Sequence, residues 1–178
     1  MRIIAGTRRG HKLYEFDGMD IRPTTDRVKE SMFNLIQDFV LGSRVLDLFS
    51  GSGALSFEAL SRGAEYAVCV DKDINSIAVI EKNNASLGFS NVKILNCDAM
   101  RYLAETKDKF SLIFLDPPYN KGFIAPIIEE IVKRDVLKPD GIIVLESDFS
   151  DEHGDFAELT KLKQKKYGRS YVTVYKRG

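Results

Sequence analysis

The sequence has no tryptophan and is poor in cysteine and histidine, with two of each among 178 residues. Two cysteines cannot form the disulfide framework of a small secreted domain, and we interpret Cys69 and Cys97 as reduced thiols. His11 and His153 are isolated from other ligand-type residues, so no zinc or other metal site is expected. No apolar run approaches the ~20 residues of a membrane span, and no signal peptide opens the chain. These absences favour a cytoplasmic protein that has neither a membrane span nor a metal site.

The chain also lacks net charge, but its charges are unevenly distributed. It has 26 basic and 26 acidic residues. Residues 1–12 carry four basic side chains and residues 161–178 carry seven, and neither segment contains an acid. Residues 13–160 therefore carry a net charge of −11. Basic ends on an acidic body favour a polyanionic partner such as nucleic acid, unless the lysines only protect the edge strand of a sheet.

Strand and helix patterns alternate from residue 44 onward, which predicts an α/β fold with a mainly parallel sheet. Buried-strand patterns cover 44–49, 66–70, 92–95, 111–115 and 142–146, and helix patterns cover 54–62, 73–87, 99–105 and 123–134. Residues 138–141 (Lys-Pro-Asp-Gly) predict a turn before the last of these strands. Residues 161–177 predict a final antiparallel hairpin that turns near Gly168.

A different segment precedes this core. Residues 2–6 and 11–16 predict a hairpin through 7–10, whose tip carries two arginines. A helix is predicted over 26–39, with an apolar face formed by Val28, Met32, Leu35, Ile36 and Phe39. We expect one domain over 1–178, made of a hairpin appendage (1–21) and a catalytic core (22–178).

The tetrapeptide Asp116-Pro117-Pro118-Tyr119 carries the strongest functional signal. It directly follows the buried strand 111–115, where open α/β sheets bind ligands. An aromatic amine such as guanine N2 or adenine N6 is a poor nucleophile, because its lone pair is delocalised into the ring. Asp116 and a carbonyl of the rigid proline turn can accept its two N–H bonds, and Tyr119 can stack on a base removed from its helix. We therefore predict methyl transfer to a nucleobase amine, although an ordinary strand-to-loop turn uses the same residues.

A second set of residues follows the earlier strands. Ser50-Gly51-Ser52-Gly53 forms a glycine turn in which the backbone can approach a ligand closely. Ser56 stands where a dinucleotide fingerprint has its third glycine, so phosphate binding is not the favoured use. Asp71 follows the next strand, where such folds place an acid on ribose hydroxyls, and Asp98 could accept from an adenine amino group. Each carboxylate could instead cap a helix, Asp98 above all.

Over nearly its whole length the chain resembles bacterial small-subunit ribosomal RNA guanine-N2 methyltransferases of the RsmD type. The most specific match is residues 22–30 (Arg-Pro-Thr-Thr-Asp-Arg-Val-Lys-Glu), with the basic hairpin before it. Residues 2–6, 9–13, 46–55 and 58–63 also match. The glycine turn and the Asp-Pro-Pro-Tyr motif are shared by many amino-methyltransferases, including adenine-N6 enzymes. The family often has Phe where this chain has Tyr119, and both rings can stack.

The resemblance implies a class I S-adenosylmethionine-dependent methyltransferase fold, Rossmann-like, with a mostly parallel seven-stranded sheet, an antiparallel C-terminal hairpin and a small N-terminal β-hairpin extension. It implies that the cofactor is bound by Asp47, Ser50, Gly51, Gly53, Asp71, Asp98 and Ala99. It implies that Asp116 and the Pro117 carbonyl bind the guanine amine, while Tyr119 stacks on the base. RNA contacts are expected at Arg8, Arg9, Lys12, Arg22 and Arg27, of which the last two could equally brace the N-terminal segment.

The expected activity is methyl transfer to guanine N2 of 16S rRNA, within the small subunit or its assembly intermediate, by a monomeric cytoplasmic enzyme. An adenine-N6 methyltransferase acting on RNA or DNA is the nearest alternative, because the tetrapeptide does not distinguish the two amines. The length leaves no room for a separate DNA-recognition domain. A non-catalytic nucleotide-binding module would not require Asp116, and a small-molecule methyltransferase would not require basic termini.

Overall fold

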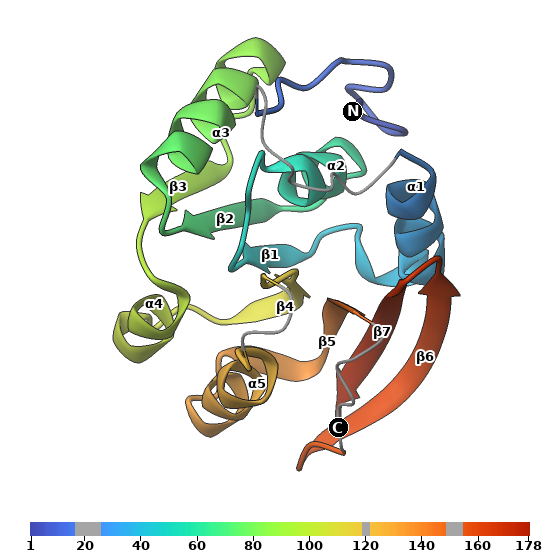
Figure 1. Ribbon diagram of the computed structural model, residues 1–178, viewed down its shortest axis with the longest axis vertical. Helices are drawn as coiled ribbons and strands as arrows, with labels where there is room; N and C mark the ends of the chain where they lie inside the picture. The colour runs from blue at the N-terminus through green and yellow to red at the C-terminus, as the bar shows by residue number, and fades with distance from the viewer. Residues whose placement is uncertain (17–25, 119–121, 149–154) are drawn as a thin grey trace.

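The computed structural model describes residues 1–16, 26–118, 122–148 and 155–178. In these ranges seven strands form one sheet with the order β3-β2-β1-β4-β5-β7-β6 (Figure 1). Strands β1 to β5 run parallel to one another, and β7 is antiparallel to both of its neighbours. The strands are β1 (Arg44–Asp47), β2 (Tyr66–Asp71), β3 (Val92–Asn96), β4 (Phe110–Leu115), β5 (Leu137–Asp148), β6 (Leu159–Tyr167) and β7 (Ser170–Arg177). This arrangement confirms the predicted mostly parallel sheet with an antiparallel C-terminal hairpin.

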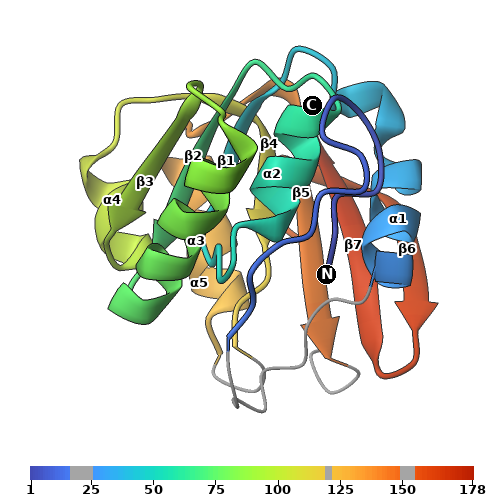
Figure 2. The same ribbon diagram turned by 90° about the horizontal axis from the view of Figure 1, so that it is seen from above.

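Helices cover both faces of the sheet, which gives the molecule three layers (Figure 2). One face carries α1 (Asp26–Leu35), the 3₁₀ helix η1 (Gln37–Phe39), α2 (Ala54–Ser61) and α3 (Ile74–Leu87), and the other carries α4 (Ala99–Glu105) and α5 (Ile124–Lys133). No helix in the described ranges is long and apolar enough to cross a membrane. The parallel strands all end at one edge of the sheet, between these two layers.

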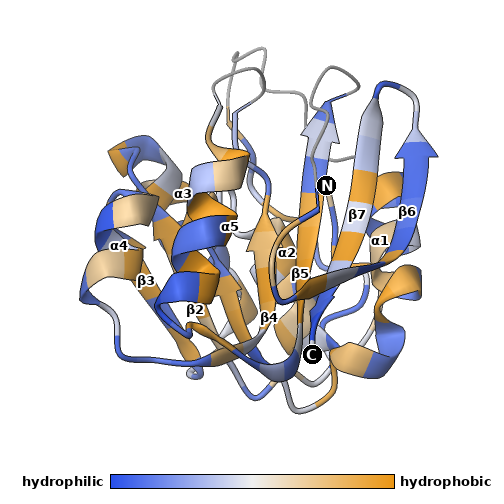
Figure 3. Cartoon of the chain, turned by 90° about the horizontal axis from the view of Figure 1, so that it is seen from below, coloured by the Kyte–Doolittle hydropathy of each residue, from blue (hydrophilic) through white to orange (hydrophobic). Residues whose placement is uncertain are grey.

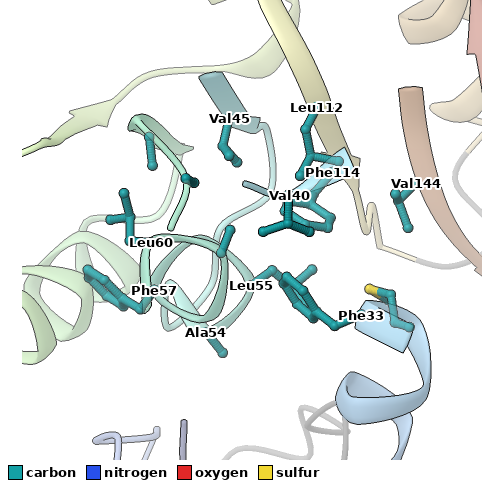
Figure 4. Packing of buried hydrophobic residues seen from close by; sticks show 14 of the residues in the cluster. Phe33, Val40, Val45, Ala54, Leu55, Phe57, Leu60, Leu112, Phe114 and Val144 are labelled. Atoms are coloured by element: carbon teal, nitrogen blue, oxygen red, sulfur yellow. The ribbon is translucent and has the colours of Figure 1, made fainter. Parts of the chain in front are cut away.

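Each face of the sheet has its own hydrophobic cluster. On the face covered by α1 to α3, side chains of β4 and β5 such as Phe114 and Val144 pack with Phe33 and Leu55 (Figure 4). Leu115 and its neighbours on the other face pack with α4 and α5. Side chains along a strand alternate between the two faces of the sheet. The cluster to which one strand residue belongs therefore shows which face the next residue on that strand points to.

Local capping residues explain why several helix predictions are confirmed. The Asp73 side chain accepts a hydrogen bond from Asn75 N at the start of α3, and Gly88 ends that helix with a φ of 73°. Asp98 accepts from Met100 N and Arg101 N at the start of α4. Such caps satisfy backbone groups that the helix leaves unpaired, so they fix boundaries from local sequence alone.

Three predicted elements differ in the structure. The helix predicted over 26–39 ends at Leu35, because Ile36 leaves the helical region (φ −116°, ψ 13°) before η1. The turn predicted at 138–141 lies inside β5 as an irregularity: Phe110 pairs with Leu137, but Leu112 pairs with Ile142. The N-terminal hairpin contains one isolated bridge, Arg2 with Lys12, instead of two regular strands. Nearby tertiary contacts hold this segment, so strand pairing is not required.

The N-terminal segment (residues 1–16) is held by a buried ionic cluster on α1 and α2. The Glu58 carboxylate accepts from Ile4 N at 2.9 Å and Ala5 N at 3.1 Å. It also pairs with Lys29 Nζ at 3.1 Å and Arg62 Nε at 2.8 Å. The Lys29 and Glu58 side chains are both fully buried. Burial lowers the Lys29 pKa, and the charge of Glu58 opposes that shift.

The segment also packs directly on the end of α2. Gly6 has a φ of 84°, and a Cβ at this position would lie 1.8 Å from the Ser61 carbonyl oxygen. Thr7 N donates to that same carbonyl at 2.8 Å, and the Ser61 hydroxyl donates to Ala5 O at 2.6 Å. A residue other than glycine at position 6 would therefore force the segment away from α2.

Candidate active site

Asp47 ends β1 and is almost completely buried, with 1% of its surface exposed. Its Oδ2 accepts from Ser56 Oγ at 3.0 Å, and its carbonyl accepts from Ser50 Oγ at 2.8 Å. Oδ1 is buried without a hydrogen-bond partner among the described residues. Burial raises the pKa of Asp47 to about 7, although the Ser56 hydrogen bond opposes the shift. An orphaned buried acceptor of this kind fits a cationic or N–H-bearing ligand.

The turn after β1 and the carboxylate after β2 form one unit. Gly51 and Gly53 have φ values of 55° and 79°, a region that other residues rarely adopt. Gly51 N donates to Asp71 Oδ2, and Asp73 N donates to Asp71 Oδ1, both at 2.9 Å. Each carboxylate oxygen keeps a second lone pair that a ligand hydroxyl can use. The predicted cofactor residues Ser50, Gly51, Gly53 and Asp71 are therefore brought together beside Asp47.

Asp98 and Ala99 follow β3 at the same edge. Asp98 Oδ1 accepts from Met100 N at 2.9 Å and from Arg101 N at 3.1 Å. This is the helix-capping role that the sequence left open. Neither bond uses Oδ2, and Ala99 is buried at the first position of α4. Contact of these two residues with an adenine ring stays a prediction.

Asp116 follows β4 and lies in a strongly acidic setting. Its side chain is partly exposed, Pro117 is buried and Pro118 is exposed, while Tyr119 lies outside the described residues. Loss of hydration raises the Asp116 pKa well above its ordinary value, and the negative charges of Glu146 and Asp47 raise it further. The site thus favours either a proton on Asp116 or a ligand that donates hydrogen bonds to it.

Glu146 is a site residue that the sequence analysis missed. It lies near the end of β5 and is 6% exposed. The pairing of Leu115 with Leu145 places Glu146 beside Asp116 on the adjacent parallel strand. The available signal was a carboxylate as the last residue of the apolar run 142–146. Only the register between the two strands shows which carboxylate it adjoins. In the described ranges no group of three or more histidine, cysteine or acidic residues could hold a metal ion.

The predicted RNA-contact residues are held in different ways. Arg8 Nε donates to Leu87 O at 2.7 Å, and its guanidinium lies 5.3 Å from the centre of the Phe89 ring. These contacts fasten the N-terminal segment to the end of α3. Arg9 and Arg27 are exposed and line a pocket of about 380 Å³ between that segment and α1.

The other two predicted RNA-contact residues lie at the surface or outside the described ranges. Lys12 is exposed opposite Arg2, and Arg22 belongs to a range that the structure does not describe. Four of the five C-terminal lysines lie on β6, a hydrophilic edge strand (Figure 3), and Lys176 lies on β7. Lys163 Nζ donates to Leu35 O at 3.0 Å. This placement fits edge protection, the alternative that the sequence left open.

The raised pKa of Asp47 predicts a pH-dependent stability. Its ordinary value is 3.8 and its native value is about 7, so the folded protein holds this proton between about pH 4 and 7 while the unfolded chain releases it. The Asp47 contribution to the free energy of unfolding therefore falls as pH rises through that window. We expect Asp47→Asn to remove this loss, which is at most about 4 kcal/mol.

Urea unfolding at pH 4.5, 6 and 7.5 measures the effect as the difference between variant and wild type. Asp108→Asn is the control, because Asp108 is exposed in the loop before β4. The stability advantage of Asp47→Asn over wild type should grow with pH. An advantage that does not change with pH would contradict the burial argument.

Comparison with known proteins agrees with the family resemblance that the sequence indicates. A family model described as conserved hypothetical protein 95 matches residues 1–176. The chain belongs to this family, the RsmD family. YlbH of Bacillus subtilis (strain 168) is 38% identical over 182 residues, which cover 99% of both chains. Ribosomal RNA small subunit methyltransferase D of Escherichia coli (strain K12) is 37% identical over 148 residues, 83% of this chain and 75% of the relative. The solved structure of yhhF from Escherichia coli is 34% identical with a TM-score of 0.91, covering 99% of this chain and 97% of that one.

Membership of the RsmD family confirms the resemblance, and the strand order confirms the class I methyltransferase fold. The structure also explains why some segments that match the family lie away from the strand ends. The RsmD-type residues Lys29, Glu58 and Arg62 form the buried cluster that holds the N-terminal segment. Gly6, from another matching segment, is the position where a side chain would strike α2. These parts of the RsmD pattern therefore have a structural explanation.

Proposed function

We propose that this protein transfers a methyl group from S-adenosylmethionine to the N2 amine of a guanine in small-subunit ribosomal RNA. The observation that carries this proposal is the placement of Asp116 and Pro117 beside the Asp47–glycine turn–Asp71 unit, in a chain of the RsmD family. The name of the Escherichia coli relative, ribosomal RNA small subunit methyltransferase D, supports the RNA substrate. The reaction would take place in the cytoplasm, on the subunit or its assembly intermediate, with a monomeric enzyme.

The residues at the ends of β1 to β3 suit S-adenosylmethionine. Asp47 Oδ1 offers a buried anionic acceptor to a cationic group, and Gly51 and Gly53 leave the turn open to close approach. Asp71 offers its remaining lone pairs to ribose hydroxyls, and Asp98 with Ala99 lies where the adenine ring would end. The cofactor supplies a methyl group on a positively charged sulfur, which needs neither a metal ion nor a covalent enzyme intermediate.

Asp116 would orient and polarise the target amine. Its carboxylate and the Pro117 carbonyl accept the two N–H bonds of the amine, which turns the nitrogen lone pair toward the methyl group. Holding both reactants in line removes much of the entropic barrier. As the methyl arrives, positive charge develops on nitrogen, and the negative Asp116 stabilises it. Asp116 need not deprotonate the guanine beforehand, because the amine becomes acidic only during transfer. The proton that the nitrogen then loses would pass to Asp116 or to solvent, and S-adenosylhomocysteine would be the other product. Tyr119 is proposed to stack on the base.

Arg9 and Arg27 are proposed to bind RNA phosphates at the pocket beside α1. Both are exposed, and a duplex or loop lying across the N-terminal segment would meet them together. We expect Arg9→Ala and Arg27→Ala each to weaken RNA binding and to lower the slope of log affinity against log salt by about 1. Filter binding over a salt series measures this slope, and Lys107→Ala is the control, an exposed lysine in the α4–β4 loop. Slopes equal to that of the control would remove these two arginines from the RNA surface.

The decisive test of the proposal is transfer of labelled methyl to small subunits that lack the modification, followed by nucleoside mass spectrometry. N2-methylguanosine in the small-subunit RNA is the expected product. N6-methyladenosine would instead assign the same site to an adenine enzyme. No incorporation into any RNA would contradict the proposed activity altogether.

A further inference from the structure

Asp116 and Glu146 form a pair of carboxylates at the ends of adjacent strands. Leu115, the last residue of β4, pairs with Leu145 of β5 in parallel register, so Asp116, which directly follows β4, neighbours Glu146 of β5. The strands of a sheet lie about 4.8 Å apart, which places the two acids within reach of one planar ring. The negative charge of Glu146 acts directly on Asp116.

Both side chains project to the same face of the sheet. Phe114 and Val144 belong to the cluster under α1 and α2, whereas Leu115 and Leu145 belong to the cluster under α4 and α5. Because strand residues alternate between faces, Glu146 of β5 returns to the α1 and α2 face. Asp116 takes the next position after β4, and the charges of Glu146 and Asp47, which act on it, agree with the same face. Asp47 also points there, since Val45 lies in that same cluster. Three carboxylates therefore line one side of the site, and the buried Oδ1 of Asp47 has no partner among the described residues.

Guanine and adenine differ at the atom next to the amine that is methylated. Guanine has a hydrogen-bond donor, N1–H, beside its N2 amine, so both of these neighbouring groups on its edge are donors. Adenine presents an unprotonated N1 beside its N6 amine, which is an acceptor. A carboxylate facing N1 would accept a hydrogen bond from guanine, but it would oppose the lone pair of adenine.

We propose that Glu146 is a specificity-determining residue that selects guanine by accepting the hydrogen bond from N1–H, while Asp116 binds the neighbouring N2 amine. This inference rests on the proposed function and names the group that chooses between the two bases. The proposal also explains why two acids lie side by side. Their negative charges repel each other, and a guanine edge that donates a hydrogen bond to each carboxylate would offset this repulsion. The tetrapeptide after β4 does not distinguish guanine N2 from adenine N6. In this proposal Glu146, on the adjacent strand β5, distinguishes them.

The test compares two nucleosides as competitive inhibitors of methyl transfer to small subunits. Guanosine carries both N1–H and the N2 amine, whereas 2-aminopurine riboside carries the amine without N1–H. We expect the wild-type protein to bind guanosine about 10-fold or more tightly than 2-aminopurine riboside. In Glu146→Gln the amide can either accept from N1–H or donate to N1, so this preference should fall toward 1. Glu146→Asp keeps the charge and should retain part of the preference, which separates recognition from a purely structural role.

Glu129→Gln, on the exposed side of α5, is the matched control and should keep the wild-type preference. A preference that is unchanged in folded Glu146→Gln would overturn the inference, and so would a wild-type protein that guanosine does not inhibit. The two proposals fail separately. N6-methyladenosine in the mass spectrum would overturn the proposed function, whereas N2-methylguanosine with an unchanged preference would overturn only the role of Glu146.

Discussion

Replacing Asp116 by Ala should reduce methyl transfer by about 10²–10³-fold or more, because the variant can neither orient the amine nor stabilise the charge that develops on it. Asp116→Asn should lie between wild type and Ala. Its amide oxygen still accepts one N–H bond, but it carries no negative charge. Cofactor binding should remain nearly intact in both variants, since the hydrogen bonds that join the glycine turn and Asp73 to Asp71 do not involve Asp116. Single-turnover transfer and calorimetric titration of S-adenosylmethionine measure the two effects separately.

The stability of these variants provides a second readout. The Asp116 pKa is raised by lost hydration and by the charges of Glu146 and Asp47, so the ionised carboxylate does not stabilise the free protein. Its removal should leave the free energy of unfolding at pH 7 unchanged or higher. Asp108→Asn, the same chemical change at an exposed site, should alter neither activity nor binding. Full activity of Asp116→Ala would remove Asp116 from the reaction, and parallel loss of cofactor binding would move its role to the cofactor.

Replacing Glu58 should destabilise the protein more than any surface change. Its buried carboxylate neutralises Lys29, binds Arg62, and accepts two backbone N–H groups of the N-terminal segment. Glu58→Gln leaves the buried ammonium without a counter-charge, and breaking a buried pair from one side costs about 3–5 kcal/mol. Urea unfolding measures this loss, and limited proteolysis should show earlier cleavage in residues 1–16.

A matched control for Glu58 exists on α4. Arg101 and Glu105 also form an Arg–Glu pair four residues apart, in the reverse order along the helix, but their side chains are 72% and 63% exposed. Glu105→Gln should cost less than about 1 kcal/mol, because exposed pairs contribute little. Replacing Lys29 and Glu58 together by Met should be less destabilising than the sum of the single changes, since the fully buried ammonium is then not left without its counter-charge. The remaining cost comes from Arg62 and the two backbone N–H groups, which still lose their acceptor. Equal effects of Glu58→Gln and Glu105→Gln would contradict a role for burial.

The elements that could be predicted are those whose signals are local. Asp73, Gly88 and Asp98 mark helix ends because each satisfies backbone groups within its own turn. Alternation of strand and helix patterns was enough for the parallel sheet, and glycine or acidic residues after the apolar runs identified the edge where the site lies. The glycine turn, Asp71 and Asp98 followed from that edge as cofactor candidates, since parallel strands all end there, whereas Asp47 and Ala99 were implied by the family resemblance.

The features that could not be predicted depend on contacts between distant segments. Glu58 meets Ile4 across 54 residues, and Arg8 meets Leu87 across 79. No local pattern distinguishes the buried Lys29 or the engaged Arg8 from surface charges. The importance of Glu146 depends on the register between β4 and β5, in which a shift of one residue would turn its side chain to the other face.

The N-terminal segment has a consequence for the order in which the chain folds during synthesis. Its partners Glu58, Asn83 and Leu87 lie 53 to 79 residues downstream of the groups that they bind. At about 5–20 residues per second, the ribosome needs roughly 4 to 16 s to deliver Leu87 after Arg8. During that interval the surface on which Ile3 and Leu13 pack in the finished protein is incomplete. Residues that leave the ribosome early are thus among the last to reach their final positions.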